Sequence, residues 1–183
     1  KEDIRIRFVE GGPKTDLVEA MADPSCPVGI ASALDVVIAN DAGTDVVAVA
    51  AINQVSPIVF FSLRERGIRG PRQFEGKSIA LLKNATLQFY GMLDRVGVDP
   101  DTMRKEPFSL EMTRLYEGEV DIWSGYHTNL VSRAEEQGYR LNVIHPMDYG
   151  IQVYDDVIYA RRELVQQNPE LVLRFLRAGF EGW

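Results

Sequence analysis

Short runs of β-branched and other hydrophobic residues alternate along the chain with segments whose apolar residues recur at helical spacing. The runs that predict strands are 4–9, 28–32, 45–52, 56–63, 77–82, 120–125, 141–146 and 156–160. Helices are expected within 11–23, 33–43, 86–96, 112–120 and 129–138, and from residue 168 onward. Strands that alternate with helices over the whole length are typical of an α/β protein with mostly parallel sheets.

Polar residues mark the starts of several of these helices. Asp16 and Glu19 have the spacing of a capping box, and Ser32 stands directly before the next helix. Asn168 followed by Pro169 predicts an N-cap and a proline in the first turn. A connection rich in Gly and Pro at 67–77 is the candidate crossing point between two lobes.

Composition narrows the possible partners. The 183 residues are 45% hydrophobic and 26% charged, which is an ordinary balance for a globular protein. The formal net charge is −7 and the chain has no basic run, so no nucleic-acid partner is expected. The longest apolar run, 46–52, is too short to span a bilayer. No signal or membrane segment precedes Lys1, and we expect a piece excised from a longer protein.

Few residues are available for catalysis or for metal binding. Cys26 is the only cysteine, and His127 and His145 are the only histidines, without an HExxH pair. A zinc site is therefore not expected. The sequence also shows no GxSxG motif, which marks the nucleophile elbow of α/β-hydrolases. A single histidine in a turn that opens a helix, such as His127, is expected at the surface or at the edge of a pocket.

Four turns follow predicted strands, where open α/β sheets bind their ligands. In the first, 10–16, Gly11 and Gly12 either let the backbone approach a ligand or simply allow a tight turn. In the second, Ser32 either binds a ligand or only caps its helix. The third, 83–88, presents polar groups at a helix start, and its Asn84-Ala85-Thr86 also matches a glycosylation sequon.

The fourth turn lies in DIWSGYHTNL, residues 121–130, and a related segment follows at 147–156. Trp123 and Tyr126 have flat faces suited to gripping a planar ring, although alternation in the strand could equally turn Trp123 into the core. Asp148 and Tyr149 add a carboxylate that can accept hydrogen bonds from ring N–H groups, or they form a solvated turn.

The order of these segments resembles one known family. EGGPKTD, GIAS, VVAVAAINQVSPIVFFSL and GIRGPRQFEGKSIAL, followed by GEVDIWSGYHTN, EEQGYRLNVIHPMDYGIQVYDDVIYA and NPELVLRFLRA, are similar to periplasmic solute-binding proteins of the thiamine-pyrimidine precursor type. The resemblance covers nearly the whole chain. It implies a type II periplasmic-binding-protein fold, in which two α/β lobes close over a ligand. Residues 1–63 and 155–183 would form one lobe, and residues 64–154 the other.

Members of this family usually begin with a further strand and helix and continue past the last segment, so we expect a chain truncated at both ends. Where members often read T-N-E-P, this chain has Thr128-Asn129-Leu130-Val131, which removes an acidic contact. The residues that the resemblance implicates in ligand binding coincide with the turns above. They are Gly11, Gly12, Pro13, Ser32, Gln54, Ser56, Asn84, Thr86, Ser124, Gly125, Tyr126, Asn129, Asp148 and Tyr149, and the aromatic side chain of Trp123 is added from the argument on the fourth turn.

Three functions are compatible with this resemblance. The first is extracytoplasmic binding of a small heteroaromatic solute, such as a thiamine pyrimidine precursor, in an interlobe cleft for delivery to the membrane permease of an ABC transporter. The second is ligand sensing by a domain fused to a signalling module such as a histidine kinase. The third is a pyrimidine synthase that uses pyridoxal phosphate and iron. Because those enzymes carry a cysteine-rich motif and this chain has only Cys26, we expect a binding protein without a cofactor.

Overall fold

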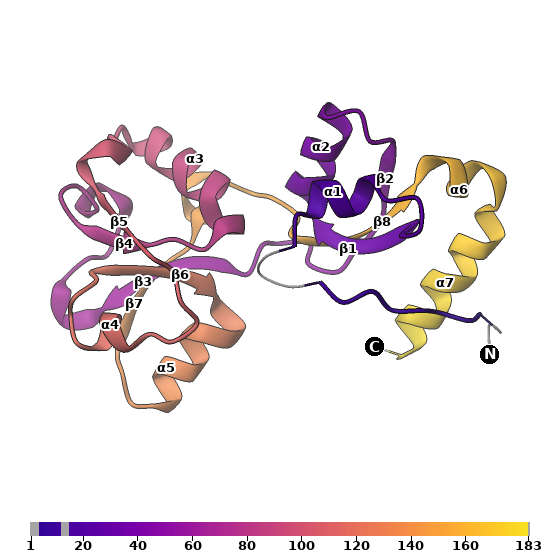
Figure 1. Cartoon of the computed structure of the whole chain (residues 1–183). Helices are drawn as coiled ribbons and strands as arrows, with labels where there is room; N and C mark the ends of the chain where they lie inside the picture. Colours follow the sequence, from indigo (N-terminus) through magenta and orange to yellow (C-terminus); the bar gives the residue numbers. More distant parts are fainter. Residues whose placement is uncertain (1–3, 12–14, 183) are drawn as a thin grey trace. The chain divides into compact units, whose positions relative to one another are not determined.

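A computed structural model describes residues 4–11 and 15–182 of the chain (Figure 1). The chain forms two compact units, of which unit 1 comprises Lys1–Ser56 with Val153–Trp183 and unit 2 comprises Pro57–Gln152. The chain therefore crosses between the units after residue 56 and after residue 152. The expected boundaries, 63 and 154, assigned 57–63 to the wrong lobe, because that strand pairs only inside unit 2.

Unit 1 is built on a three-stranded antiparallel sheet with the order β1-β8-β2. Its strands are β1 (Val28–Ser32), β2 (Val46–Ala51) and β8 (Asp156–Arg161). Its helices are α1 (Leu17–Ala22), α2 (Ala33–Asp41), α6 (Arg162–Gln167) and α7 (Pro169–Gly182). Met21 of α1 and Val36 and Ala39 of α2 pack with Val157 and Tyr159 of β8 to form the core of this unit.

The caps predicted in unit 1 are confirmed. The Asp16 carboxylate accepts hydrogen bonds from two backbone N–H groups at the start of α1. The Ser32 hydroxyl accepts one from Asp35 N–H at 3.1 Å and caps α2. Asn168 caps α7 by accepting a bond from Leu171 N–H at 3.2 Å. These side chains replace hydrogen bonds that the first turn of each helix lacks.

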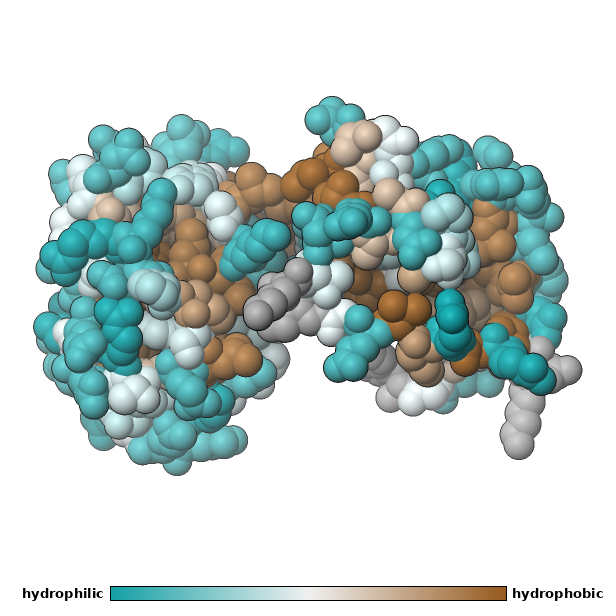
Figure 2. All heavy atoms as spheres, in the orientation of Figure 1, coloured by the Kyte–Doolittle hydropathy of each residue, from teal (hydrophilic) through white to brown (hydrophobic). Residues whose placement is uncertain are grey.

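The strand predicted at 4–9 does not form. Residues 4–9 follow no regular structure, and Phe8 is 89% exposed. Figure 2 shows hydrophobic side chains on the visible surface. Other exposed hydrophobic residues of unit 1 include Val37, Ile38 and Leu173. Alternation of polar and apolar residues supplies the pattern of a strand, but a strand also needs a hydrogen-bonded partner, and among the described residues none pairs with this segment.

Unit 2 contains a five-stranded sheet with the order β5-β4-β6-β3-β7. Its strands are β3 (Ile58–Leu63), β4 (Ser78–Ala80), β5 (Arg104–Glu106), β6 (Ile122–Tyr126) and β7 (Leu141–Ile144). Its α-helices are α3 (Thr86–Val96), α4 (Thr113–Tyr116) and α5 (Ser132–Glu136), and a π-helix spans His127–Val131. Short 3₁₀ helices lie at Arg64–Arg66, Pro71–Gln73, Lys83–Ala85, Pro100–Thr102 and Pro146–Tyr149.

One sheet is mixed and the other antiparallel, so the expectation of mostly parallel sheets was wrong. In unit 2, β4 pairs in parallel with β5 and β6, whereas β3 is antiparallel to both of its neighbours. In unit 1 both strand pairs are antiparallel. Hydrophobic runs of similar length fit either direction, because the direction depends on the path of the connections and not on the strand itself.

Strand β3 lies between β6 and β7 in the sheet of unit 2, and all six of its residues are buried. Ile58 and Phe60 face a cluster that includes residues of α3, and Val59 and Phe61 face a second cluster with residues of α4 and α5. Unit 2 is therefore a three-layer structure in which helices cover both faces of one sheet (Figure 1).

The segment 67–77 lies wholly inside unit 2 and is not a crossing point. Ile68 and Phe74 of this segment are buried in the core of unit 2, and the side-chain amide of Gln73 forms two hydrogen bonds within the segment. That amide donates to Gly67 C=O at 3.1 Å and accepts from Arg69 N–H at 2.7 Å. Glycine and proline here mark a packed turn rather than a linker.

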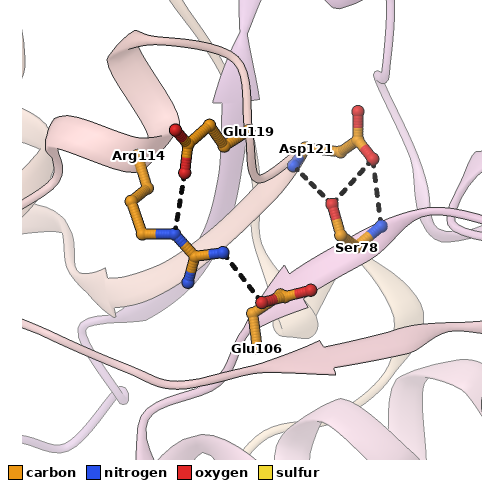
Figure 3. Close-up of polar contacts among 5 residues, drawn as sticks. All are labelled: Ser78, Glu106, Arg114, Glu119 and Asp121. Carbon is orange, nitrogen blue, oxygen red and sulfur yellow. Dashed lines mark hydrogen bonds and ion pairs between the residues drawn. The ribbon is translucent and has the colours of Figure 1, made fainter.

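Polar contacts join neighbouring strands of unit 2 (Figure 3). Asp121 accepts hydrogen bonds from the N–H and the hydroxyl of Ser78 at 3.0 and 2.9 Å, and its own N–H donates to the Ser78 hydroxyl at 3.0 Å. Burial raises the pKa of Asp121, but the backbone and hydroxyl hydrogen bonds from Ser78 outweigh it and hold the pKa below its usual range. Arg114 bridges Glu106 at 2.8 Å and Glu119 at 3.1 Å.

We predict that Asp121→Ala lowers the free energy of unfolding by about 2–3 kcal/mol, because it leaves the buried Ser78 without its charged acceptor. A carboxylate whose pKa is lowered by folding stabilises the protein above its ordinary pKa. The difference between wild type and variant should therefore shrink as the pH falls below about 4. Chemical denaturation at several pH values measures both effects.

The matched control is Glu119→Ala, which removes a 55% exposed partner of Arg114 and should cost at most about 1 kcal/mol. Equal losses in the two variants would contradict the role assigned to the Ser78–Asp121 contact.

Candidate functional site

The carboxyl ends of four strands meet at one edge of the sheet in unit 2. β4, β5 and β6 run in parallel, and β7 shares their direction because both β6 and β7 are antiparallel to β3. The same edge receives the start of β3, where the chain enters the unit. Turns and helix starts at such an edge expose backbone and polar groups, which makes it the expected place for a ligand.

Asn84 and Tyr126 approach each other at this edge. Asn84 lies in the turn after β4, and its amide donates a hydrogen bond to the Tyr126 hydroxyl at 3.3 Å. Tyr126 ends β6, is partly buried, and packs against the core beside α3. Thr86 begins α3 and donates its hydroxyl hydrogen bond to Lys83 C=O at 2.7 Å. The structure thus brings together three of the predicted residues from two strand ends.

The π-helix that follows β6 presents further polar side chains. His127, Thr128 and Asn129 are exposed, whereas Leu130 and Val131 are buried in the core. π-Helical turns are rare and occur frequently at functional sites. Asn129, a predicted ligand residue, therefore lies at the same edge as Tyr126 and remains accessible.

Trp123 lies in the core, which corrects its assignment to the ligand. Its side chain is fully buried, and its ring centroid lies 5.9 Å from that of Phe108. From the alternation of residues along β6, the Trp123 side chain could have pointed either to a ligand or into the core. Both faces of this sheet are covered by helices, so a side chain in the middle of β6 is buried whichever way it points.

Ser124 and Gly125 also have structural roles. The fully buried Ser124 hydroxyl accepts from Leu82 N–H at 2.7 Å and donates to Ala80 C=O at 3.2 Å, and so links β6 to β4. Gly125 lies inside β6 and not in a turn, and a Cβ there would meet Leu130 Cδ1 at 2.4 Å. These two residues therefore contribute to the packing of β6 against β4 and the π-helix, and their expected contacts with a ligand stay a prediction.

The turn after β7 adds a second set of polar groups to the edge. Asp148 is exposed, and its N–H donates to His145 C=O at 3.1 Å. Tyr149 is partly buried against the core of unit 2. The His127 and His145 rings come together with centroids 5.6 Å apart and planes at 30°. Sequence reasoning missed His145, because nothing in the sequence indicates that the turns after β6 and β7 meet.

Unit 1 has an equivalent edge, where β1 and β2 end and β8 begins. Ser32 pairs with Asp156 across the sheet, and Ser32 Oγ donates to Asp35 at 2.7 Å. The Asn53 amide donates to Asp156 at 3.0 Å, and the Ser56 hydroxyl donates to the buried Asp155 at 3.5 Å. The edge therefore gathers carboxylates, hydroxyls and an amide from three segments that are distant in sequence.

Two of the predicted residues of unit 1, Ser32 and Ser56, belong to this group. Gln54 is exposed in the connection after β2, and Gly11 is exposed before α1. Gly12 and Pro13 lie outside the described residues. Asn53, Asp155 and Asp156 were not predicted as site residues. The signal available in the sequence was their position at strand ends, since Asn53 follows β2, Asp155 precedes β8 and Asp156 begins β8.

Burial raises the pKa of Asp156, while the hydrogen bond from Asn53 acts in the opposite direction. A carboxyl group of this kind favours partners that supply a proton or an N–H donor. Among the described residues, no three His, Cys, Asp or Glu side chains gather closely enough to hold a metal ion. No helix within residues 4–11 and 15–182 combines the length and the apolar character needed to cross a membrane.

Comparisons with known proteins agree with this architecture. The family profile described as NMT1/THI5 like matches residues 1–183. The riboflavin-binding protein RibY of Chloroflexus aurantiacus is 26% identical over 99% of this chain and 53% of its own length. The formylaminopyrimidine-binding protein of Halalkalibacterium halodurans is 24% identical over 100% of this chain and 57% of its own length. The chain thus spans about half the length of these relatives.

Solved structures show the same fold. The periplasmic aliphatic sulphonate binding protein SsuA of Escherichia coli matches with a TM-score of 0.72 at 19% identity, over 87% of this chain and 53% of that protein. The alkanesulfonate-binding protein SsuA of Xanthomonas axonopodis, bound to MOPS, matches with a TM-score of 0.66 at 19% identity, over 90% of this chain and 57% of that protein. The chain has the α/β fold of periplasmic solute-binding proteins, as the sequence resemblance predicted.

We predict that Asp156→Asn stabilises the protein at neutral pH. When folding raises the pKa of a carboxyl group, the folded state holds the proton more tightly, and stability falls as the pH rises through that range. The asparagine avoids this cost and can still accept the hydrogen bond from Asn53. Its advantage over wild type should disappear at a pH below the ordinary carboxyl pKa of about 4. Thermal unfolding across pH 3–8 measures the difference.

Asp148→Asn serves as the control; because this side chain is exposed, its replacement relieves no cost of burial and should not stabilise the protein at neutral pH. An Asp156→Asn variant with the same pH profile as wild type would contradict the prediction.

Proposed function

Because the chain belongs to the NMT1/THI5-like family, we propose that it is part of an extracytoplasmic solute-binding protein of an ABC transporter, which binds a small planar heteroaromatic solute. The observation that carries the proposal is the pair of polar edges, one in each unit, at the ends of strands. The arrangement is suited to holding a ligand rather than to changing it.

Each edge, taken by itself, offers different groups for recognition. In unit 2, Tyr126 presents an aromatic side chain whose hydroxyl is held by Asn84. In unit 1, the partly buried Asp156 supplies a carboxyl group that can accept hydrogen bonds from ring N–H or amino groups. Aromatic faces with a few placed polar groups are the usual composition of a small-molecule site. The interlobe cleft that the resemblance implies stays a prediction.

The named relatives guide the choice of ligand. One is a riboflavin-binding protein and the other a formylaminopyrimidine-binding protein, and both of those ligands contain planar nitrogen heterocycles. The two sulfonate-binding structures support only the fold. We therefore expect tighter binding of riboflavin or formylaminopyrimidine than of an alkanesulfonate. Isothermal titration calorimetry with these three probes tests the proposal, and failure of the protein to bind either heterocycle would count against it.

Delivery to a permease separates this proposal from ligand sensing. Uptake of the bound solute by membrane vesicles that contain the cognate permease, dependent on this protein, supports transport. Ligand-dependent phosphorylation by a fused kinase would instead support the sensing function. Fractionation of cells that express the full-length protein tests the extracytoplasmic location separately.

We predict that Tyr126→Ala weakens binding of the heterocyclic ligand by roughly tenfold, because it removes the aromatic face at the carboxyl end of β6. Tyr126→Phe keeps the ring and loses only the hydroxyl that Asn84 holds, so its affinity should fall by a smaller factor. Calorimetry measures the affinities, and thermal unfolding shows whether each variant folds. Unchanged affinity in a folded Tyr126→Ala variant would assign this residue to core packing alone.

A further inference from the structure

The chain contains two histidines, and the fold brings them into contact. His127 opens the π-helix after β6, and His145 follows β7 directly. Their ring centroids lie 5.6 Å apart, and the planes are inclined by 30°. In the sheet order β3 lies between β6 and β7, so the two rings meet beside the start of β3. The backbone N–H of His127 donates a hydrogen bond to Pro57 C=O at that point, at 2.9 Å.

The backbone supports the outward placement of His127. Leu130 and Val131 must point into the core formed with α4 and α5, and they are 3% and 0% exposed. The wider π-turn lets these two side chains reach the core while His127, Thr128 and Asn129 stay in solvent. His145 is only partly buried. The ring pair therefore presents imidazole surface to solvent at the same edge as Tyr126.

The chemistry of imidazole suits one class of ligand. A neutral imidazole has a flat face, one N–H donor and one nitrogen acceptor. Flat aromatic faces stack on planar rings, whereas the donor and the acceptor can pair with the amino groups and ring nitrogens of a heterocycle. An aliphatic sulfonate offers neither a planar face nor a donor. A stacked pair is also more rigid than a single exposed ring, so less conformational freedom is lost when a ligand binds.

We infer that the His127–His145 ring pair is a specificity-determining part of the ligand edge in unit 2 and selects planar nitrogen heterocycles over aliphatic sulfonates. The inference rests on the proposed function and extends it to two residues. His127 was expected only at the surface or at the edge of a pocket, and His145 was not among the predicted ligand residues. The pair acts as a unit, because each ring holds the other in place. Loss of either ring should therefore cost nearly as much as loss of both.

The test compares His127→Ala, His145→Ala and the double variant with wild type, using riboflavin, formylaminopyrimidine and ethanesulfonate as probes in calorimetry. Affinity for whichever heterocycle wild type binds should fall by about three- to tenfold in each single variant and by a similar factor in the double variant. Any affinity for ethanesulfonate should be the same in all four proteins. Thr128→Ala removes an exposed neighbour on the same π-helix and should bind like wild type.

Thermal unfolding of each variant excludes a folding defect, and nuclear magnetic resonance of the imidazole C–H protons in wild type reports ring contact directly. Those signals should shift on addition of the bound heterocycle and not on addition of ethanesulfonate. If wild type binds a heterocycle and the folded double variant binds it equally well, the inference is wrong and the proposed function stands. If wild type binds neither heterocycle, the proposed function fails, and the inference fails with it.

Discussion

The complete burial of β3 is the constraint on which unit 2 depends. Its side chains alternate between two hydrophobic clusters, so one strand holds both layers of helices to the sheet. It is also the strand that runs against β6 and β7. Because β3 runs opposite to the other four strands of the sheet, it begins at the edge where they end. The crossing into unit 2 after residue 56 therefore lies beside the candidate ligand residues of that unit. The burial of β3 therefore determines how unit 2 packs, and the direction of β3 determines where its candidate site lies.

Polar groups are distributed unequally between the two ends of this sheet. Ser78 and Asp121 form hydrogen bonds with each other at the amino-terminal ends of β4 and β6, so these polar groups are paired within the protein. At the carboxyl ends, Asn84, Tyr126 and Asn129 remain at least partly accessible. A group whose hydrogen bonds are all satisfied internally stabilises the fold, whereas an accessible group can exchange water for a ligand. This difference separates the structural polar residues from the candidate binding residues.

Part of the candidate site could be predicted from sequence because it follows from local rules. Ser32 as a cap and Asn84 with Thr86 in a turn before a helix depend on residues within a few positions. Trp123, Ser124 and Gly125 could not be placed in this way. Their surroundings come from Phe108, Leu82 and Leu130, and only the covering of both sheet faces decides that they are buried. Asp155, Asp156 and His145 were missed because their partners Ser56, Asn53 and His127 come from other segments of the chain, and only the fold brings these segments together.

The sequence by itself determined the alternation of strands and helices, the capped helix starts, and the resemblance to solute-binding proteins, because periodicity and capping are local properties. Only the tertiary structure decided the direction of the strands, the positions of the two crossings and the failure of residues 4–9 to form a strand. These features depend on hydrogen bonds between segments far apart in the chain. The contact of His127 with His145 belongs to the same class, since two turns meet only when the strands before them share one sheet.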